Sequence, residues 1–590
     1  MRLWPSFIAT LLPALILLAC AQGTAPREGS FPTPQELDQL RQESPSESPF
    51  PVDVLDVPSW ELEEPLVDRL GATPRAPATV WDGFFAEAVA RREGLVLATE
   101  EMHCVAREIG RFHVTHRRRP ASGLLRFIAA RCGVPAAAVS FGNVQGSVPR
   151  SFSEDRLFEQ WRSTLREVTE SQLVGGPRFV GIWFGRQEDY AVAIVAAVER
   201  EVRVDPIATI LGEDRRFVLR GEALVPVDRM RVLINRGRHR VVECAPNPEV
   251  ALPSFEFECE AAQRDPTAWV AVSLLPPGRV LARSVLEILL RAPGERADVY
   301  RRPPQIASLP VADPERLPEE MTALVNRLRR EAEFVPLRVA PEQSRVASEL
   351  APHFFSALFG QTKQEFLDLV LLGMMAGWQV DGIIQRSQVS FTWVSASNDV
   401  GRLLAEALDH PMSRETLMDP RCEKIAIGAL AGESDSSLPA LTALIASYAM
   451  FSEASHAKMQ AEIFERFTRA RAERGLGPPD RLSELDAIVI DAANRVESGE
   501  DRKRALSWLI DESVDVLQRA VNGWVFEVTD LDQLEFPEDF LTRRRLGLAI
   551  GVSHHRPEGE PWGRYVVMLV VAEPEHRTAA GRPKDGLAPL

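Results

Sequence analysis

Lysine is the scarcest charged residue in this 590-residue chain, and positive charge as a whole is in deficit. Only five of the 68 basic side chains are lysines, and 84 acidic side chains leave a formal net charge of −16. Because a negative chain repels phosphate groups, we expect no nucleic-acid partner. Apolar residues form 45% of the sequence, so global disorder is excluded and the length predicts about three to five packed domains.

Several signatures of enzymes are also missing. The chain has no Gly-x-Ser-x-Gly nucleophile elbow and no cysteine–histidine protease signature. It has no Walker loop and no dinucleotide-binding glycine loop. These absences argue against the common serine-hydrolase and nucleotide-dependent classes.

An export signal is predicted at residues 1–20. The apolar segment over residues 11–18 is interrupted by Pro13 and is too short to span a bilayer comfortably. Residues 17–20, Leu-Leu-Ala-Cys, resemble the lipobox of bacterial lipoproteins, in which the signal is removed and the cysteine is acylated. The alternative is an ordinary signal peptide that contains a cysteine. We predict membrane anchoring through Cys20, and the Ala-Gln that follows favours the outer membrane by the same resemblance.

The segments flanking the folded part are poor in apolar residues. Residues 21–76 are rich in proline, serine and glutamate and cannot bury enough apolar surface to fold well. They predict a disordered, extended tether, with short anchoring contacts from Trp60 or Leu66 as an added option. Residues 575–590 are predicted to be a disordered tail.

Between these ends a helix–loop–strand pattern occurs three times. Each copy opens with an arginine-rich helix and closes on an apolar, β-branched run containing a glycine. Around residues 202–304 this pattern gives way to short alternating strands, which predict a β-sandwich. The predicted class is therefore α+β. The modules span residues 77–201, 305–455 and 456–574, and their closing runs are Phe179–Ile182, Ile425–Gly428 and Leu548–Val552.

The stretch from His410 to Pro420, followed by the strand Ile425–Gly428, resembles the CAP superfamily. This is the domain of cysteine-rich secretory proteins, antigen 5 and plant pathogenesis-related proteins. Its bacterial motif is matched at Pro411, Arg414, Leu417 and Gly428, while Ser413 stands where the family has a histidine. The resemblance implies an α-β-α sandwich for each of the three modules.

CAP proteins that bind a divalent cation use two histidines and one or two glutamates. In this chain the resemblance places the first histidine at Ile109, Leu350 and Ile490. It places the glutamate at Gly142, Gly377 and Gly523, and the second histidine at Glu167, Ser413 and Asp539. The resemblance therefore implies modules without the family's metal, and we expect no cofactor. Trp378 and Trp524 are predicted to occupy equivalent positions in the cores of their modules rather than to line a ligand-binding site.

Two histidine pairs have a spacing that could suit a metal. The arginines at 117–119 directly follow His113 and His116 and would repel a cation, which favours a solvated loop. His554 and His555 are expected in a hairpin loop after a strand, as surface residues. Neither pair is predicted to bind a metal.

Apart from the acylated cysteine, five thiols remain in a compartment where disulfides persist, so one must stay unpaired. Of the fifteen possible pairings, module membership selects one, provided that the modules fold independently. It predicts the disulfides Cys104–Cys132 and Cys244–Cys259 and a free Cys422. Each bridge would stabilise the chain by about 3 kcal/mol if its α-carbons lie about 4.4–6.8 Å apart.

Two functions remain open from the sequence. We favour a non-catalytic cell-envelope lipoprotein whose CAP-like modules form a scaffold for an envelope protein or a hydrophobic ligand. The alternative is an envelope hydrolase that acts on peptide or peptidoglycan at an unrecognised site. A cleft filled by apolar side chains favours the scaffold, and one with convergent carboxylates and histidines favours the hydrolase.

Overall fold

The structure is a computed structural model. It describes residues 31–43, 54–63, 70–92, 94–295, 298–311, 313–359, 362–363, 365–395, 397–432, 439–451, 456–531 and 534–573. The predicted signal with Cys20, Leu66 and the predicted tail at 575–590 lie outside these residues. None of the helices in these ranges is long and apolar enough to cross a membrane.

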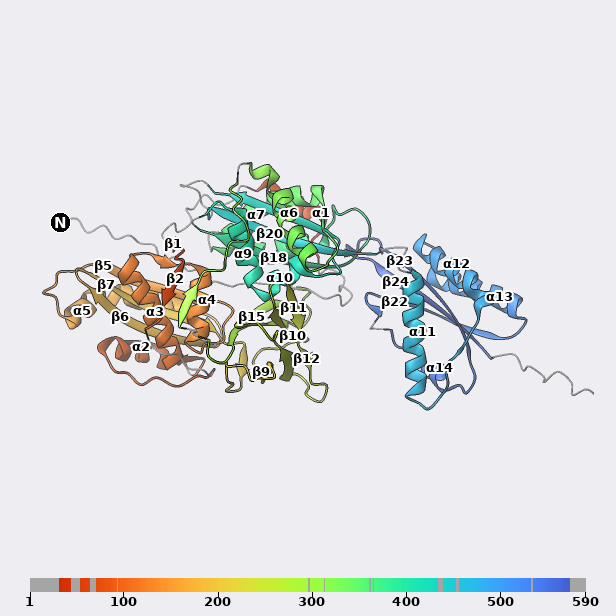
Figure 1. The fold of residues 1–590 in the computed structure, drawn as a ribbon, viewed down its shortest axis with the longest axis horizontal. Coiled ribbons are helices and arrows are strands. Elements are labelled where there is room, and N and C mark those ends of the chain that lie inside the picture. The colour runs from red at the N-terminus through yellow and green to blue at the C-terminus, as the bar shows by residue number, and fades with distance from the viewer. Residues whose placement is uncertain are drawn as a thin grey trace, which may run out of the picture. The chain divides into compact units, whose positions relative to one another are not determined.

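Contacts divide the chain into two compact units. Among the described residues, unit 1 holds 31–380 and 387–449, and unit 2 holds 381–386 and 450–573. Unit 1 contains the first two helix-and-strand modules and the β-rich module between them, and unit 2 contains the third helix-and-strand module (Figure 1). The predicted α+β class is confirmed by this mixture of helices and sheets.

The first module is a four-stranded sheet with helices on both faces. Its sheet has the order β3-β6-β7-β5. Along β7, Ala193 and Val195 join a core with α2 and α5, while Val192 and Ile194 join a core with α3 and α4. The elements are α2 (Val80–Ala90), β3 (Val96–Ala98), α3 (Glu100–His116), β4 (Arg119–Pro120), α4 (Ser122–Arg131), β5 (Ser140–Ser147), α5 (Glu154–Gln172), β6 (Arg178–Gln187) and β7 (Tyr190–Glu199).

The second and third modules repeat this strand order, as β17-β19-β20-β18 and β21-β23-β24-β22. In all three sheets the first strand pairs parallel with the second, and the second pairs antiparallel with the third. The second module consists of α6 (Leu317–Glu331), β17 (Arg338–Val339), α7 (Pro341–Leu358), α8 (Glu365–Ala376), β18 (Ile384–Val394), α9 (Val400–Asp409), α10 (Pro411–Met418), β19 (Lys424–Ala431) and β20 (Leu441–Met450). The third consists of α11 (His456–Ala472), β21 (Asp480–Arg481), α12 (Asp486–Glu497), α13 (Arg502–Leu517), β22 (Val521–Val528), α14 (Glu538–Thr542), β23 (Gly547–His555) and β24 (Arg564–Ala572).

One glycine in the second strand of each sheet allows a helix backbone to lie directly on the sheet. A Cβ added at Gly181 would lie 2.2 Å from the carbonyl carbon of Met102 on α3. Gly428 and Gly551 meet the backbones of α7 and α12 in the same way, at Ala347 and Val489, with 2.3 and 2.0 Å to the nearest atom. These are the glycines of the predicted closing runs, and they explain why a larger residue is excluded there.

The β-rich module consists of two packed sheets around one apolar core. Their strand orders are β11-β10-β14-β15 and β12-β13-β9-β8. The strands are β8 (Val202–Val204), β9 (Arg216–Ala223), β10 (Arg229–Arg236), β11 (Arg240–Glu243), β12 (Ala245–Pro246), β13 (Ser254–Glu260), β14 (Thr267–Leu275) and β15 (Arg283–Arg291).

The prediction of a disordered tether over residues 21–76 is wrong for the described parts of that segment. Helix α1 (Pro34–Gln42) begins at a capping box between Thr33 and Glu36 and buries Leu37 against α8 at Gly373. Strand β1 (Val54–Leu55) pairs with β4, and β2 (Ser59–Glu61) pairs with β16 (Val299–Arg301). The average composition of the segment did not predict these contacts, because a few apolar residues are enough to fix a short helix or strand on a surface that is already folded.

Trp60 makes one of the anchoring contacts expected for the N-terminal segment. It lies on β2, and its ring meets Phe112 edge-on at 5.1 Å between centroids. His116 is a second ring neighbour, at 5.4 Å. This part of the N-terminal segment is therefore held against α3.

Candidate functional site

The positions aligned with the first CAP histidine are not structurally equivalent. Ile109 and Leu350 are fully buried, whereas Ile490 is 38% exposed. The helix residues that contact the sheet glycines are Met102, Ala347 and Val489, so these three positions are equivalent. Ile109 lies seven residues after Met102, and the same step in the other two helices leads to Phe354 and Val496. All three are buried and apolar. The sequence alignment slipped in the second and third modules because weak similarity along a helix fixes no register, whereas backbone contact does.

The three glycines aligned with the CAP glutamate also differ in their surroundings. Gly142 lies on β5 and faces Val168 of α5, whereas Gly523 lies on β22 and faces α13. Gly377 follows α8 in a turn with positive φ. The prediction of equivalent middle glycines is therefore wrong, and so is the equivalence of Trp378 and Trp524, which follow two of them. Trp378 donates to the Pro32 carbonyl at 2.9 Å, and Trp524 packs on Phe540 with ring centroids 4.0 Å apart.

The positions aligned with the second CAP histidine lie in different environments. Glu167 is exposed on α5, Asp539 is exposed on α14, and Ser413 is buried in α10. In the part of the chain that the structure describes, no three histidine, cysteine, aspartate or glutamate side chains lie close enough together to hold a metal ion.

The predicted solvated loop at His113 and His116 is wrong. Both residues belong to α3, which ends where Arg117 adopts a left-handed conformation with φ of 55°. His113 is fully buried. Burial, with the nearby charge of Arg119, lowers the pKa of His113 to about 4. The helix therefore continues to the residue just before the arginines at 117–119.

His554 and His555 are also misplaced by the sequence prediction. Both lie within β23, because the ladder with β24 continues to the pair His555 and Arg564. His554 is only 6% exposed, and its Nδ1 lies 2.8 Å from Nε2 of His456. Phe451 stacks on the His554 ring at 4.9 Å.

The cysteines pair as follows in the structure. Cys104 and Cys132 form a disulfide between α3 and the end of α4, with α-carbons 5.7 Å apart. Cys244 and Cys259 form a second disulfide in the β-rich module, with α-carbons 4.6 Å apart. Cys422 is buried and belongs to neither disulfide.

A buried polar cluster in unit 1 lies where its three modules meet. Arg126 on α4 of the first module forms an ion pair with Glu287 on β15 and donates to Asp409 at the end of α9, at 2.9 Å. Its guanidinium also lies 3.5 Å from the ring centre of Trp269 on β14. The side chain of Arg126 is 2% exposed and that of Glu287 is fully buried. One guanidinium therefore bridges the first, the β-rich and the second modules.

A second set of contacts joins the β-rich module to α10. Arg231 on β10 donates to Glu415 at 2.8 Å and to Glu243 at 2.9 Å. Arg414 donates to the carbonyls of Leu408 and Gly237, at 2.6 and 2.9 Å. Sequence reasoning missed this role. The available signal was a pair of charged residues, Arg414 and Glu415, within the stretch that carries the CAP resemblance.

The pKa shifts at this junction show how the charges depend on one another. Burial alone would raise the pKa of Glu287, but Arg126 and His410 hold it below its ordinary value. Burial opposes the charged form of Arg231, yet Glu415 and Glu243 raise its pKa above the ordinary value. Arg414 has carbonyl partners, and burial lowers its pKa to about 10. Arg126 and Arg231 are therefore paired with carboxylates at this junction, whereas Arg414 is held by carbonyl groups.

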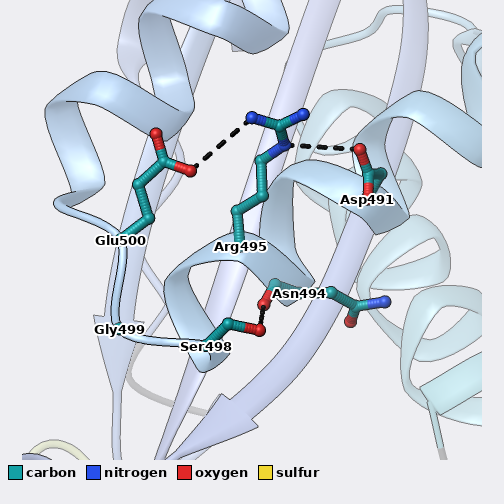
Figure 2. A pocket seen from close by; sticks show the side chains of 6 residues that line it. All are labelled: Asp491, Asn494, Arg495, Ser498, Gly499 and Glu500. Carbon is teal, nitrogen blue, oxygen red and sulfur yellow. Dashed lines mark hydrogen bonds and ion pairs between the residues drawn. The ribbon is translucent and has the colours of Figure 1, made fainter.

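Unit 2 carries a polar surface hollow between α12 and α13, lined by Asp491, Asn494, Arg495, Ser498, Gly499 and Glu500 (Figure 2). Arg495 lies between two carboxylates, 3.3 Å from Asp491 and 3.6 Å from Glu500. Its guanidinium also covers the ring of Trp508 at 3.7 Å. The guanidinium of Arg495 is therefore paired with carboxylates on both sides within the hollow.

No protein-family model matches the chain, and no curated protein matches it either. Among solved structures, a cysteine-rich secretory protein from Staphylococcus aureus subsp. aureus Mu50 is similar to it, with 12% sequence identity. The match covers 42% of this chain and 84% of that protein, with a TM-score of 0.18. Its name places it among the proteins that the sequence motif resembles. At so low a TM-score it carries no part of the functional argument.

Proposed function

We propose that this chain is a non-catalytic, lipid-anchored scaffold of the bacterial cell envelope, built from CAP-like modules and anchored to the outer membrane through Cys20. The single observation that carries the scaffold proposal is the Arg126 junction, where one buried guanidinium contacts all three modules of unit 1. Removing one partner of a buried ion pair typically costs about 3–5 kcal/mol, so the contacts of Arg126 oppose separation of the three modules. Rigidity is what a scaffold requires in order to keep its binding loops in place.

Three further features support the proposal. The strand order shared by the three sheets supports their interpretation as repeats. The helix positions equivalent to Ile109 are apolar and buried in every module, so the space beneath the second helix is filled. Two disulfides suit an exported protein, because such bonds persist in oxidising compartments.

The anchor is tested by metabolic labelling with a palmitate analogue. We expect the wild type to carry the label and to sediment with membranes, and Cys20→Ala to lose both properties. Cys422→Ala is the matched control and keeps the label, because its thiol is buried. A Cys20→Ala chain that remains membrane-bound, with no label on the wild type, would contradict the anchor.

The absence of catalysis is tested with isolated peptidoglycan and with a peptide mixture. We expect the purified chain to release no soluble fragments from either substrate. Release that is abolished by Glu167→Gln or Asp539→Asn would favour the hydrolase instead, since these carboxylates are the exposed ones at the aligned positions.

The binding role is tested in cells with a photo-crosslinking residue at Val174, which is 59% exposed in the turn after α5. A scaffold with a defined partner gives one discrete crosslinked product. The same residue placed at the buried Val195 is the matched control and gives none. A featureless smear from both positions would contradict a specific binding role.

A further inference from the structure

Helix α1 docks the N-terminal segment on the second module. Its two buried side chains, Leu37 and Leu40, are 4% and 2% exposed. Leu37 lies over Gly373 of α8, where an added Cβ atom would be 2.6 Å from one of the leucine methyl carbons. The glycine therefore leaves the space that Leu37 fills, and α1 contacts both α7 and α8 (Figure 1).

Polar contacts hold both ends of α1 on the same surface. Just before the helix, the carbonyl group of Pro32 accepts a hydrogen bond from the indole of Trp378 at 2.9 Å. In the last turn, Arg41 forms an ion pair with Glu349 of α7. We call this surface, which includes Glu349, Gly373 and Trp378, the α1 seat.

The helix depends on this seat for its own stability. It has nine residues, and isolated helices shorter than about 12–15 residues are marginal in water. A chain that left the seat would therefore also lose its helix, and its length would increase from about 1.5 Å to as much as about 3.6 Å per residue. Docking of α1 and shortening of the N-terminal segment are thus the same event.

The position of α1 limits how far the folded part can lie from an anchor at Cys20. Phe31, the first described residue, follows Cys20 by eleven positions. Because an extended chain spans at most about 3.6 Å per residue, these positions bridge at most about 40 Å. After α1, the next strand pairing among the described residues joins Val54 to Arg119. Val54 follows Cys20 by thirty-four positions, which would bridge up to about 120 Å if α1 were not docked.

We propose that α1 is a strap that sets the distance between the folded part of this chain and the membrane. While α1 is docked, its seat stays within about 40 Å of the lipid surface, and when α1 leaves the seat this reach increases about threefold. Tension on the anchor acts directly on α1, because the helix lies between Cys20 and the pairing at Val54. The strap rests on the proposed lipid anchor at Cys20 and adds a conformational control to it.

The strap is tested with the full lipidated chain in phosphatidylethanolamine–phosphatidylglycerol vesicles that carry an acceptor dye on their headgroups. A fluorescent donor residue replaces Glu365, which is exposed on α8, and energy transfer reports its distance from the lipid. A Gly-Ser segment of about twenty residues, inserted between Pro26 and Arg27, lowers the transfer by about twofold or more, because it lengthens the chain before α1. The same segment inserted between Ser46 and Glu47 leaves the transfer unchanged, because docked α1 takes that part of the chain out of the span.

Docking itself is tested with Leu37→Asp, which places a carboxylate against Gly373. This variant lowers the transfer, and the insertion after α1 now lowers it further, as the insertion before α1 does. Gln39→Asp is the matched control, since it adds the same charge on the exposed face of α1 and keeps the wild-type transfer. Thermal unfolding of both variants checks that unit 1 stays folded, and the two insertions decide the question without any change in the folded part.

The outcomes separate the strap from the anchor. A wild type that carries the palmitate label but responds equally to the two insertions overturns the strap and leaves the anchor in place. The same holds if Leu37→Asp and Gln39→Asp give equal transfer. A wild type without the label overturns the anchor and the strap together.

Discussion

His113 is a buried histidine that sequence reasoning placed in solvent. Burial and Arg119 lower its pKa from 6.5 to about 4. Between these two values the unfolded chain binds a proton at this residue and the folded chain does not. The free energy of unfolding therefore rises with pH across this window and is lost as the pH falls through it.

We predict that replacing His113 removes this pH dependence. On lowering the pH from 6.5 to 4, the wild type loses up to about 3 kcal/mol more stability than His113→Leu, because each pKa unit corresponds to about 1.4 kcal/mol. Urea unfolding at a series of pH values measures the difference. His116→Leu is the control, since His116 lies on the same helix and is less buried. Parallel pH profiles for the wild type and His113→Leu would contradict the assignment.

At the scale of elements, the close approach of a helix to a sheet at a glycine defines all three helix-and-strand modules. We predict that Gly428→Ala destabilises unit 1 by about 1–3 kcal/mol, since the new methyl group would meet the α7 backbone at 2.3 Å. Gly146→Ala on β5 is the control, because nothing lies within 4 Å of its Cβ position. Thermal unfolding of both variants is the measurement. Equal melting temperatures would show that α7 moves away without cost.

The Cys104–Cys132 disulfide joins two helices of the first module across a separation of 28 residues. We expect the double variant Cys104→Ala and Cys132→Ala to lose about 3 kcal/mol, mainly because its unfolded chain gains freedom. Denaturant unfolding with and without a reducing agent checks this. The wild type should respond to the reducing agent and the double variant much less. Alkylation of both cysteines in the native exported protein would contradict the bridge.

At the scale of the whole molecule, the Arg126 junction decides whether the modules of unit 1 unfold together. Arg126→Met leaves Glu287 buried without its main partner, which costs about 3–5 kcal/mol. We predict that calorimetry resolves separate module transitions in this variant and one transition for unit 1 in the wild type. Arg162→Met is the control, since the exposed pair of Arg162 with Glu159 is worth less than about 1 kcal/mol.

A second variant separates the role of charge from that of packing at this junction. The pair Arg126→Met and Glu287→Met removes both charges and should recover most of the lost stability, because apolar residues of similar volume often replace a buried ion pair without loss. If the double variant is as unstable as Arg126→Met, the junction depends on the contacts of Arg126 with Trp269 and Asp409 instead.

Features that depend on neighbouring residues were accessible from the sequence. These include the α+β class and the closing strands with their glycines, because side-chain periodicity and β-branched content act locally. The cysteine pairing predicted from module membership agrees with the bridges in the structure. The lipobox at Cys20 remains a prediction, since that residue lies outside the described part of the chain.

The tertiary structure decided which residues are buried and which backbones touch. The Arg126 hydrogen bonds to Asp409 span 283 positions, and no local pattern encodes a contact of that range. The same holds for α1, which folds onto α7 and α8 although its own segment is poor in apolar residues. Burial of His113 and the register of the three modules were likewise decided by packing, because desolvation and steric contact depend on elements distant in the sequence.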